Sequence, residues 1–182
     1  MSCYASRGTS GCARPADEAL DLGCGAARNA IPLARAGWDV MGLDLSWPML
    51  TAAAPRAHEE GIANRLRLVL APMDEIPARD RSFDLVIAHG IWNLARSAAE
   101  FQRALRETAR VARPGAGLFV FTQFSGQLQC FLTESQLVSE LAAVGFAADP
   151  AVPVTEYNRP RPGTLPTGTV PVIYEAAFRH TG

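Results

Sequence analysis

An apolar run at residues 19–22 leads directly into Gly23 and Gly25, which are separated by a single residue. This order is typical of a strand, a tight turn and a helix start at the carboxyl edge of a parallel sheet, where open α/β sheets bind ligands. Glycine there lets backbone N–H groups approach a ligand closely, beside the positive end of a helix dipole. The same glycines also serve plain strand-to-helix turns, so the pair on its own does not identify a ligand.

A carboxylate follows this turn at an informative distance. Asp44 ends the next apolar run, roughly 20 residues beyond the turn. A carboxylate in that position accepts hydrogen bonds from both hydroxyl groups of a ribose. A helix-capping role for Asp44 is the alternative.

Arg28 and Asp21 argue against a dinucleotide as the ligand. A dinucleotide turn has a third glycine where Arg28 stands, because the helix and strand pack closely there against the pyrophosphate. Asp21, just before the turn, would repel a pyrophosphate and would help to hold an ammonium group. These residues indicate a ligand with an adenosine-like ribose and an amino-acid-like end, and they disfavour a nucleotide-binding oxidoreductase.

The chain between residues 18 and 123 alternates short apolar runs with longer helical patterns. That alternation predicts a parallel sheet with crossover helices. Ser97 and Glu100 form a capping box before one of these helices, and Pro114-Gly115 is expected to end it. The five predicted strands are EALDL, WDVMGLD, LRLVLA, FDLVIAH and GLFVFTQF.

Two further strand-like runs lie near residues 150–157 and 169–179, and they have no helix between them. Such strands should pair antiparallel. They are joined by NRPRPGTLPTG, which is long for a hairpin connection. The sequence therefore predicts an α/β fold, with a doubly wound, mostly parallel sheet of about seven strands and an antiparallel C-terminal hairpin. Residues 1–16 are expected to be a flexible N-terminal segment.

Composition and charge exclude several classes of partner. The formal net charge is −1, so no strong field draws the chain to nucleic acid or to an anionic membrane surface. No apolar run reaches the roughly 20 residues of a membrane span and no signal peptide is recognisable, which favours a cytoplasmic location. The four cysteines show neither paired spacing nor histidine partners, so we expect free thiols and no metal site.

The stretch DLGCGAA at 21–27 resembles the first motif of the class I S-adenosylmethionine-dependent methyltransferases, with Ala27 in place of the last glycine. GLDLS at 42–46 and SFDLVIA at 82–88 extend this resemblance. It implies a Rossmann-like fold, a single methyltransferase domain over residues 17–182, and S-adenosylmethionine as the cofactor with S-adenosylhomocysteine as the product. GAARNAIPLARAGWDV is also similar to a stretch of compact small-molecule methyltransferases.

The resemblance implies a role for each part of the cofactor site. Backbone at the two glycines would line the methionine part, Asp44 would hold the ribose, and LAPMDEIP at 70–77 would wrap the adenine. Pro72 stands where many relatives have an acidic residue, so the contact to the adenine amino group must come from Asp74 or from backbone. The candidate cofactor-binding residues are Asp21, Gly23, Cys24, Gly25, Asp44, Leu45, Met49, Met73, Asp74 and His89.

The fourth predicted strand ends in AHGIWNLA, next to the expected methyl position. His89 is the candidate base that removes a proton from a hydroxyl or thiol acceptor, and a structural role or a cofactor contact is the alternative. Trp92 is expected either to stack on an aromatic substrate or to fill the core. The candidate substrate-binding residues are Trp92, Asn93, Gln123, Tyr157 and Arg159.

The predicted function is methyl transfer from S-adenosylmethionine to a small-molecule acceptor by in-line displacement, with no side chain covalently attached. A non-catalytic S-adenosylmethionine-binding protein, serving as a sensor or partner subunit, is the alternative. Few residues precede the first predicted strand, where many relatives have additional helices. The site is therefore expected to be open, closed by a second copy in a homodimer, or completed by a segment absent from this chain.

Overall fold

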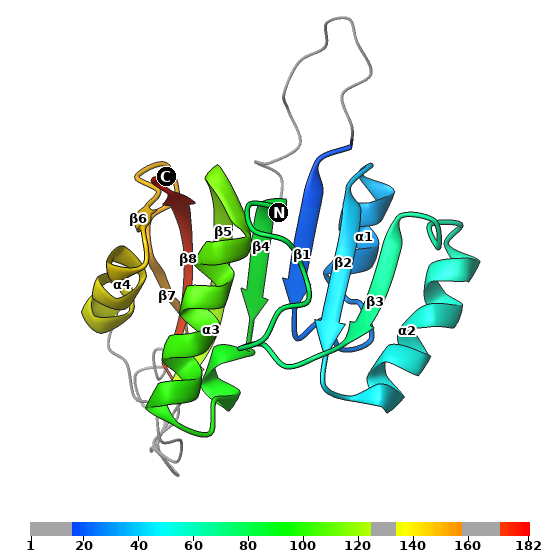
Figure 1. Ribbon diagram of the computed structural model, residues 1–182, viewed down its shortest axis with the longest axis horizontal. Coiled ribbons are helices and arrows are strands. Elements are labelled where there is room, and N and C mark those ends of the chain that lie inside the picture. Colours follow the sequence, from blue (N-terminus) through cyan, green and yellow to red (C-terminus); the bar gives the residue numbers. More distant parts are fainter. Residues whose placement is uncertain (1–15, 125–133, 158–171) are drawn as a thin grey trace, which may run out of the picture.

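The computed structural model describes residues 16–124, 134–157 and 172–182. In these residues one mixed sheet is flanked by helices on both faces (Figure 1). The sheet order is β3-β2-β1-β4-β5-β8-β6, and β7 also pairs with β8. The strands are β1 (Glu18–Leu22), β2 (Asp39–Asp44), β3 (Leu66–Leu70), β4 (Phe83–His89), β5 (Ala112–Phe124), β6 (Phe146–Ala148), β7 (Thr155–Tyr157) and β8 (Val172–His180).

The helices lie between the strands in the order that the sequence predicts. They are α1 (Ala30–Arg35), α2 (Trp47–Glu59), α3 (Ala98–Val111) and α4 (Glu134–Ala143), with a short 3-10 turn, η1 (Trp92–Leu94), after β4. The predicted α/β fold and its five parallel strands β1 to β5 are confirmed. The doubly wound order of these strands is the arrangement that binds ligands beyond their carboxyl ends.

The strand register brings three distant parts of the chain to one edge of the sheet. Leu22 of β1 pairs with Leu43 of β2 on one side and with Ala88 of β4 on the other. The next residues along the three strands are Gly23, Asp44 and His89, so these three continue the same row at the carboxyl edge. This register is fixed because a slip by one residue would turn every buried side chain to the opposite face.

The C-terminal strands run antiparallel, as predicted. β8 pairs antiparallel with β5, and β7 pairs antiparallel with β8. β6 is a strand that the sequence analysis missed; it pairs with the end of β8, from Phe146 opposite His180 to Ala148 opposite Phe178. Three residues after a glycine-ended helix carry too little alternation to predict a strand, and the pairing with β8 decides their conformation.

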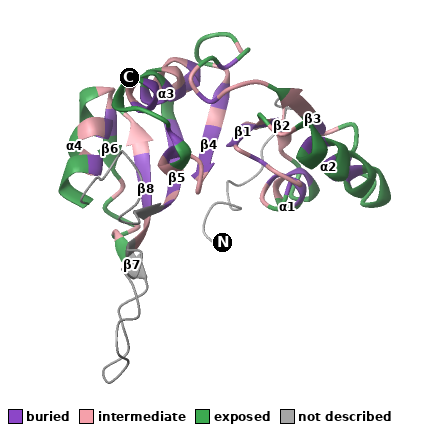
Figure 2. Ribbon diagram, turned by 90° about the horizontal axis from the view of Figure 1, so that it is seen from below, coloured by how far each residue is buried: buried purple, intermediate pink, exposed green. Residues whose placement is uncertain are grey.

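Alternate residues of the central strands build two separate cores. Leu20, Val86 and Leu118 point to the face where α3 and α4 pack, whereas Ala19 and Leu85 point to the face of α1 and α2. Figure 2 shows α3 on one side of the sheet and α1 and α2 on the other. Burial on both faces explains why these strands read as continuous apolar runs.

The end of α3 differs from the prediction. The helix ends at Val111, and Pro114-Gly115 lies inside β5 instead of stopping the helix. The carbonyls of Arg110 and Val111 accept hydrogen bonds from the N–H groups of Arg81 and Ser82. The chain therefore leaves the helix as soon as Ala112 pairs with Phe83. The other end of α3 is as predicted, because the Ser97 hydroxyl accepts from the Glu100 N–H at 3.1 Å.

Several predicted features fall outside the described residues. They are the flexible segment at 1–16 except Ala16, and the whole proline-rich connection between β7 and β8, which includes Arg159. Among the helices that the structure does describe, none has the length and hydropathy needed to cross a membrane.

Gly42 of β2 leaves the space that the Cys24 side chain occupies. A Cβ atom at Gly42 would lie 2.9 Å from Cys24 Sγ and 3.2 Å from Leu68 Cδ2. We expect Gly42→Ala to lower the free energy of unfolding by about 1–3 kcal/mol through overpacking, measured by urea denaturation. Cys24→Ala in the same chain should restore part of this loss, because it removes the closer atom. Equal losses with and without Cys24→Ala would contradict the contact.

Candidate functional site

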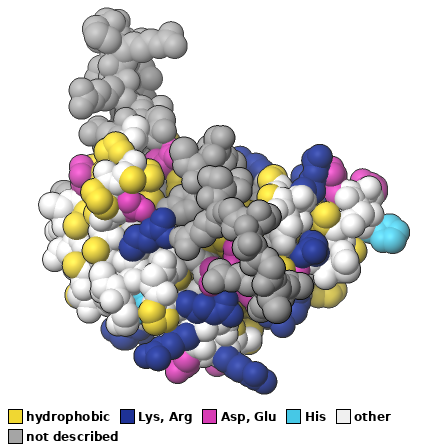
Figure 3. Space-filling model, turned by 90° about the horizontal axis from the view of Figure 1, so that it is seen from above, with side chains coloured by type: hydrophobic (Ala, Val, Ile, Leu, Met, Phe, Trp, Pro, Cys, Tyr) yellow, Lys and Arg dark blue, Asp and Glu magenta, His cyan; other side chains and the backbone are white. Residues whose placement is uncertain are grey.

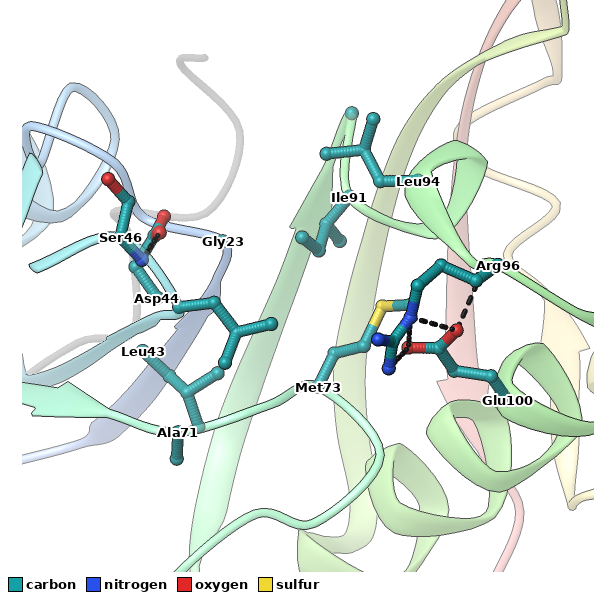
Figure 4. Close-up of a pocket in the computed structure, with 12 residues that line it drawn as sticks. Gly23, Leu43, Asp44, Ser46, Ala71, Met73, Ile91, Leu94, Arg96 and Glu100 are labelled. Atoms are coloured by element: carbon teal, nitrogen blue, oxygen red, sulfur yellow. Dashed lines mark hydrogen bonds and ion pairs between the residues drawn. The ribbon is translucent and has the colours of Figure 1, made fainter. Parts of the chain in front are cut away.

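The glycine turn, the end of β2 and the segment after β4 enclose a cavity of about 390 Å³ at the carboxyl edge of the sheet. Figure 4 shows the side chains of these segments on opposite sides of the cavity. The volume lies within the range of roughly 300–1,000 Å³ that is usual for small-molecule sites. The lining residues are Gly23, Leu43, Asp44, Leu45, Ser46, Ala71, Met73, Gly90, Ile91, Leu94, Arg96 and Glu100.

Both glycines of the turn are required by its conformation. Gly23 and Gly25 have φ of 67° and 53°, values that side chains other than glycine disfavour. A Cβ atom at Gly23 would also lie 2.7 Å from Ile91 Cδ1. Ala27 adopts φ of 62° without being glycine, so it carries backbone strain at the position where the motif has its last glycine.

Asp44 is fixed at the cavity wall by two backbone N–H groups. Gly25 N–H donates to Asp44 Oδ2 at 2.8 Å, and Ser46 N–H donates to Oδ1 at 2.7 Å. Hydrogen bonds to the charged form hold a carboxylate in one orientation, and each oxygen keeps a further lone pair for a ligand. The arrangement can therefore accept two hydroxyl donors at once.

Asp21 lies beneath the turn, fully buried, and does not line the cavity. Within the described residues neither of its oxygens has a hydrogen-bond partner of normal geometry. Burial raises its pKa to about 7, and the nearby Asn29 side chain and Ala30 N–H oppose this rise. A buried carboxyl group without a partner is a place where a cationic ligand group would be stabilised.

Cys24 ties the glycine turn to β2, does not line the cavity and supplies no thiol chemistry. Its side chain is buried, and burial, together with the charges of Asp21 and Asp44, raises the pKa of the thiol to about 12. The thiol is therefore protonated at neutral pH and unreactive. Its N–H donates to Leu43 O at 3.0 Å, which ties the turn to β2.

Much of the remaining cavity wall is apolar. Met73 is buried, whereas Leu45 and Leu94 are 64% and 59% exposed at the mouth. Exposed large apolar side chains beside a cavity are typical of a binding site for a planar, partly apolar ligand. Met49 lies next to the turn, since its Cε would be 3.1 Å from a Cβ at Gly25, but it does not line the cavity.

Asp74 is engaged elsewhere. Its Oδ2 accepts from Nε and NH2 of Arg103 of α3 at 3.0 and 2.7 Å, and it does not line the cavity. Asp74 is therefore not available for the contact to the adenine amino group, which an acidic residue makes in many relatives at the position of Pro72. Met73, the residue before it, does line the cavity.

Arg96 and Glu100 line the cavity and were missed as site residues by the sequence analysis. The nearly buried Glu100 carboxylate accepts from the Arg96 N–H at 2.7 Å and from its guanidinium at 3.1–3.3 Å. These bonds lower the pKa of Glu100. The capping box at Ser97 identified Glu100 only as a residue of the helix start. The spacing of four residues between Arg96 and Glu100 could have predicted their ion pair.

His89 contacts Arg28 and Phe121 at the end of β4. Its Nε2 lies 3.1 Å from Arg28 NH2, and its ring centroid lies 4.3 Å from that of Phe121. Its Nδ1 is buried and has no hydrogen-bond partner in the part of the chain that is described. Burial lowers the pKa of His89, Arg28 lowers it further, and Glu175 opposes this.

The remaining predicted substrate residues have different positions. Trp92 is buried and packs edge-on against Phe101 at 6.1 Å, which corresponds to the core interpretation. Asn93 follows it in η1 and is partly exposed. Gln123 of β5 and Tyr157 of β7 both pair with Ile173 of β8, so their backbones lie at one level of the sheet.

A family model described as a methyltransferase domain matches residues 19–115. A demethylmenaquinone methyltransferase of Lactiplantibacillus plantarum is 40% identical over 103 residues, which are 54% of this chain and 42% of that protein. Methyltransferase GfsG of Streptomyces halstedii is 36% identical over 102 residues, 56% of this chain and 36% of that protein. The chain thus spans less than half the length of these relatives.

Solved structures share the fold over most of the chain. An S-adenosylmethionine-dependent methyltransferase from Methanosarcina mazei superposes with a TM-score of 0.74 at 20% identity, covering 91% of this chain and 93% of that chain. A Burkholderia thailandensis 1,6-didemethyltoxoflavin-N1-methyltransferase, solved with its substrate and S-adenosylhomocysteine, gives 0.71 at 22% identity and covers 92% and 72%. The [4+2]-cyclase SpnF gives 0.74 at 20% identity and covers 90% and 75%.

The buried Asp21 predicts a pH dependence of stability. The pKa of Asp21 is about 7 in the folded chain, compared with 3.8 for an ordinary Asp side chain. Because the folded chain binds this proton more tightly than the unfolded chain, the proton stabilises the fold below pH 4, and this stabilisation is lost as pH rises through about 7. We expect Asp21→Asn to be more stable than the unmodified chain at pH 8, by up to about 4 kcal/mol, and to differ little at pH 4.

Urea denaturation at the two pH values measures this difference. Asp17→Asn, which changes an exposed carboxylate just before β1, is the control and should show no such divergence. An equal effect of Asp21→Asn at both pH values would show that Asp21 is not held protonated by burial.

Proposed function

Because the chain belongs to the class I S-adenosylmethionine-dependent methyltransferases, we propose that it transfers a methyl group from S-adenosylmethionine to a small-molecule acceptor, with S-adenosylhomocysteine as the product. The matched region contains the glycine turn, Asp44 and His89. The names of the relatives support an acceptor of this size, since they include a demethylmenaquinone and a didemethyltoxoflavin methyltransferase.

Asp44 is the observation that carries the proposal. Its carboxylate stands at the cavity wall with both oxygens oriented by backbone N–H groups. A ribose presents two adjacent hydroxyl donors, which match the two oxygens. The residues present therefore fit the nucleoside half of the cofactor.

The amino-acid end of the cofactor also fits the turn. Gly23 and Gly25 leave the turn without side chains, and a Cβ at Gly23 would occupy space against Ile91. Asp21 is buried beneath the turn without a described partner, and a bound ammonium group would stabilise the ionised form that burial disfavours. The Cys24 thiol stays neutral and takes no part in the chemistry.

The apolar walls fit an adenine ring. Leu45 and Met73 line the cavity from the ends of β2 and β3, and Ile91 and Leu94 line it from the segment after β4. Because Asp74 is paired with Arg103, we assign the polar contact to the adenine edge to backbone of residues 71–73. Met49 supports the turn from α2.

When bound, the cofactor supplies a methyl group that its sulfonium already activates, so the protein has to align the acceptor and exclude water. A bound cofactor would pass this methyl group to the acceptor atom, and the electron pair of the broken carbon–sulfur bond would stay on sulfur. The acceptor proton passes to His89 Nε2 and from there to solvent. His89 can receive it because its lowered pKa keeps the imidazole neutral near pH 7.

The proposal includes the class of the methyl acceptor. A net charge of −1 supports a small molecule over nucleic acid as the acceptor. Closure of the site in a homodimer and a cytoplasmic location stay predictions. The [4+2]-cyclase of the same fold shows why methyl transfer has to be measured and cannot be taken from the architecture.

Calorimetric titration with S-adenosylmethionine, S-adenosylhomocysteine and NAD tests the cofactor assignment. We expect the first two to bind and NAD not to bind, because Arg28 occupies the place of the third dinucleotide glycine. Asp44→Ala should weaken S-adenosylmethionine binding by about 1–3 kcal/mol, since the ribose hydroxyls lose their charged acceptor.

Two further variants serve as controls for the effect of Asp44→Ala on S-adenosylmethionine binding. Asp44→Asn preserves the size of the side chain but sets an amide NH2 against one of the two backbone N–H donors, so it should lose affinity as well. Asp17→Ala, at the opposite edge of the sheet, should bind as the parent does. Unchanged affinity in Asp44→Ala would remove the ribose assignment.

His89→Gln should slow methyl transfer by about 10²-fold or more and change cofactor affinity little, because the side chain acts on the acceptor proton. Radiolabelled methyl transfer in a screen of small acceptors measures the rate, and calorimetry measures the affinity. A collapse of cofactor affinity would instead place His89 in the cofactor site. Cofactor binding by the parent chain without transfer to any acceptor would favour the non-catalytic alternative.

A further inference from the structure

Arg28 extends from the glycine turn to the imidazole of His89, and this contact fixes how the imidazole can act. The NH2 atom of Arg28 lies 3.1 Å from His89 Nε2. A guanidinium group only donates hydrogen bonds, so Nε2 must be the accepting nitrogen. His89 is therefore neutral in this arrangement, with its proton on Nδ1.

The same contact occupies the lone pair that a base would use. Nδ1 is buried, whereas Nε2 is the nitrogen that faces Arg28. While Arg28 stays in place, Nε2 cannot take a proton from an acceptor. His89 becomes a base only when the guanidinium moves to another hydrogen-bond acceptor.

Arg28 is well placed to make that move. It is exposed, and its contact with Nε2 is the one hydrogen bond that its guanidinium makes to the described residues. The remaining donors form a planar fork that matches a carboxylate, and a charge-assisted pair of this kind is stronger than a bond to a neutral imidazole. An anionic group arriving beside His89 would therefore draw Arg28 away from Nε2.

We propose that Arg28 selects acceptors that carry a carboxylate or an equally acidic hydroxyl, and that binding this group to Arg28 releases His89 Nε2 to act as the base. This inference rests on the proposed methyl transfer and names the class of its acceptor. Arg28 is thus the specificity-determining residue and also positions the proton acceptor.

The neighbours of the pair are consistent with an aromatic or planar acid. The Phe121 ring of β5 lies against the His89 imidazole, with centroids 4.3 Å apart. Glu175 of β8, which pairs with Phe121, raises the pKa of His89 and so favours the imidazolium that forms once Nε2 takes a proton. Beneath the turn, the buried Asp21 interacts electrostatically with Arg28, and Arg28 forms no ion pair with the described residues.

Benzoate and its neutral amide, benzamide, are the probes for this site. With S-adenosylhomocysteine present, we expect benzoate to bind the parent chain at millimolar concentration or below, and benzamide to bind at least tenfold more weakly. Arg28→Gln should weaken benzoate binding at least tenfold, and Arg28→Lys should retain part of it. Arg35→Gln, on the exposed side of α1 where Arg35 pairs with Glu60, is the matched control and should bind benzoate as the parent does.

The titration of His89, followed by NMR of its imidazole, gives a second readout that a purely structural role would not move. Arg28→Gln should raise the pKa of His89, because it removes a positive charge, and Arg35→Gln should leave it unchanged. Bound benzoate should raise it in the parent chain as well. Benzoate that fails to bind, or that binds Arg28→Gln as tightly as the parent, overturns the inference.

The outcome is separable from that of the proposed function. S-adenosylhomocysteine binding to the parent chain, measured first by calorimetry, tests the cofactor site alone. If the cofactor binds and benzoate recognition is independent of Arg28, the acceptor class is wrong while the methyltransferase proposal stands. If the cofactor does not bind, the proposed function itself fails.

Discussion

Two hydrogen bonds between the glycine turn and the end of β2 hold the site together. Cys24 N–H donates to Leu43 O at 3.0 Å, and Gly25 N–H donates to Asp44 Oδ2 at 2.8 Å. The first continues the strand pairing beyond β1, and the second orients the carboxylate. β1 also pairs with β4, so the turn after β1 lies beside the segment that follows His89 at the end of β4. The cavity is thus a consequence of strand register and of one turn that only small residues can form.

Charge at this edge is arranged around a single arginine. Arg28 lowers the pKa of the buried Asp21 and that of His89, while Asp44 raises the pKa of Asp21. An acid and a base that lie on different strands are therefore coupled through one exposed guanidinium. A cationic ligand group above Asp21 and an anionic group beside Arg28 would each be electrostatically stabilised there. The two ends of the site are in this sense complementary in charge.

The cofactor half of the site could be predicted from sequence because backbone geometry determines it. Strand, glycine turn and strand-ending Asp44 are local patterns, and the parallel register of β1 and β2 brings them together at one edge of the sheet. The end of α3 could not be predicted, because its last carbonyls are capped from a distant part of the sequence. The N–H groups of Arg81 and Ser82 donate hydrogen bonds to them. The orientation of Asp74 depends in the same way on Arg103, and that of Trp92 on Phe101. Tertiary contacts decide such features, and no local pattern encodes them.

Most of the candidate substrate-binding residues lie beyond the matched region, which ends at residue 115. Most of β5 and all of β7 and β8 follow it, and their antiparallel pairing brings Gln123, Tyr157 and Ile173 to one level of the sheet. Relatives that share the turn and Asp44 can therefore differ in what they act on, since the strands near the acceptor are a separate part of the chain. Arg28 is an exception, because it belongs to the cofactor turn and yet reaches His89 at the acceptor side. A residue in that position links the choice of acceptor to the segment that holds the cofactor.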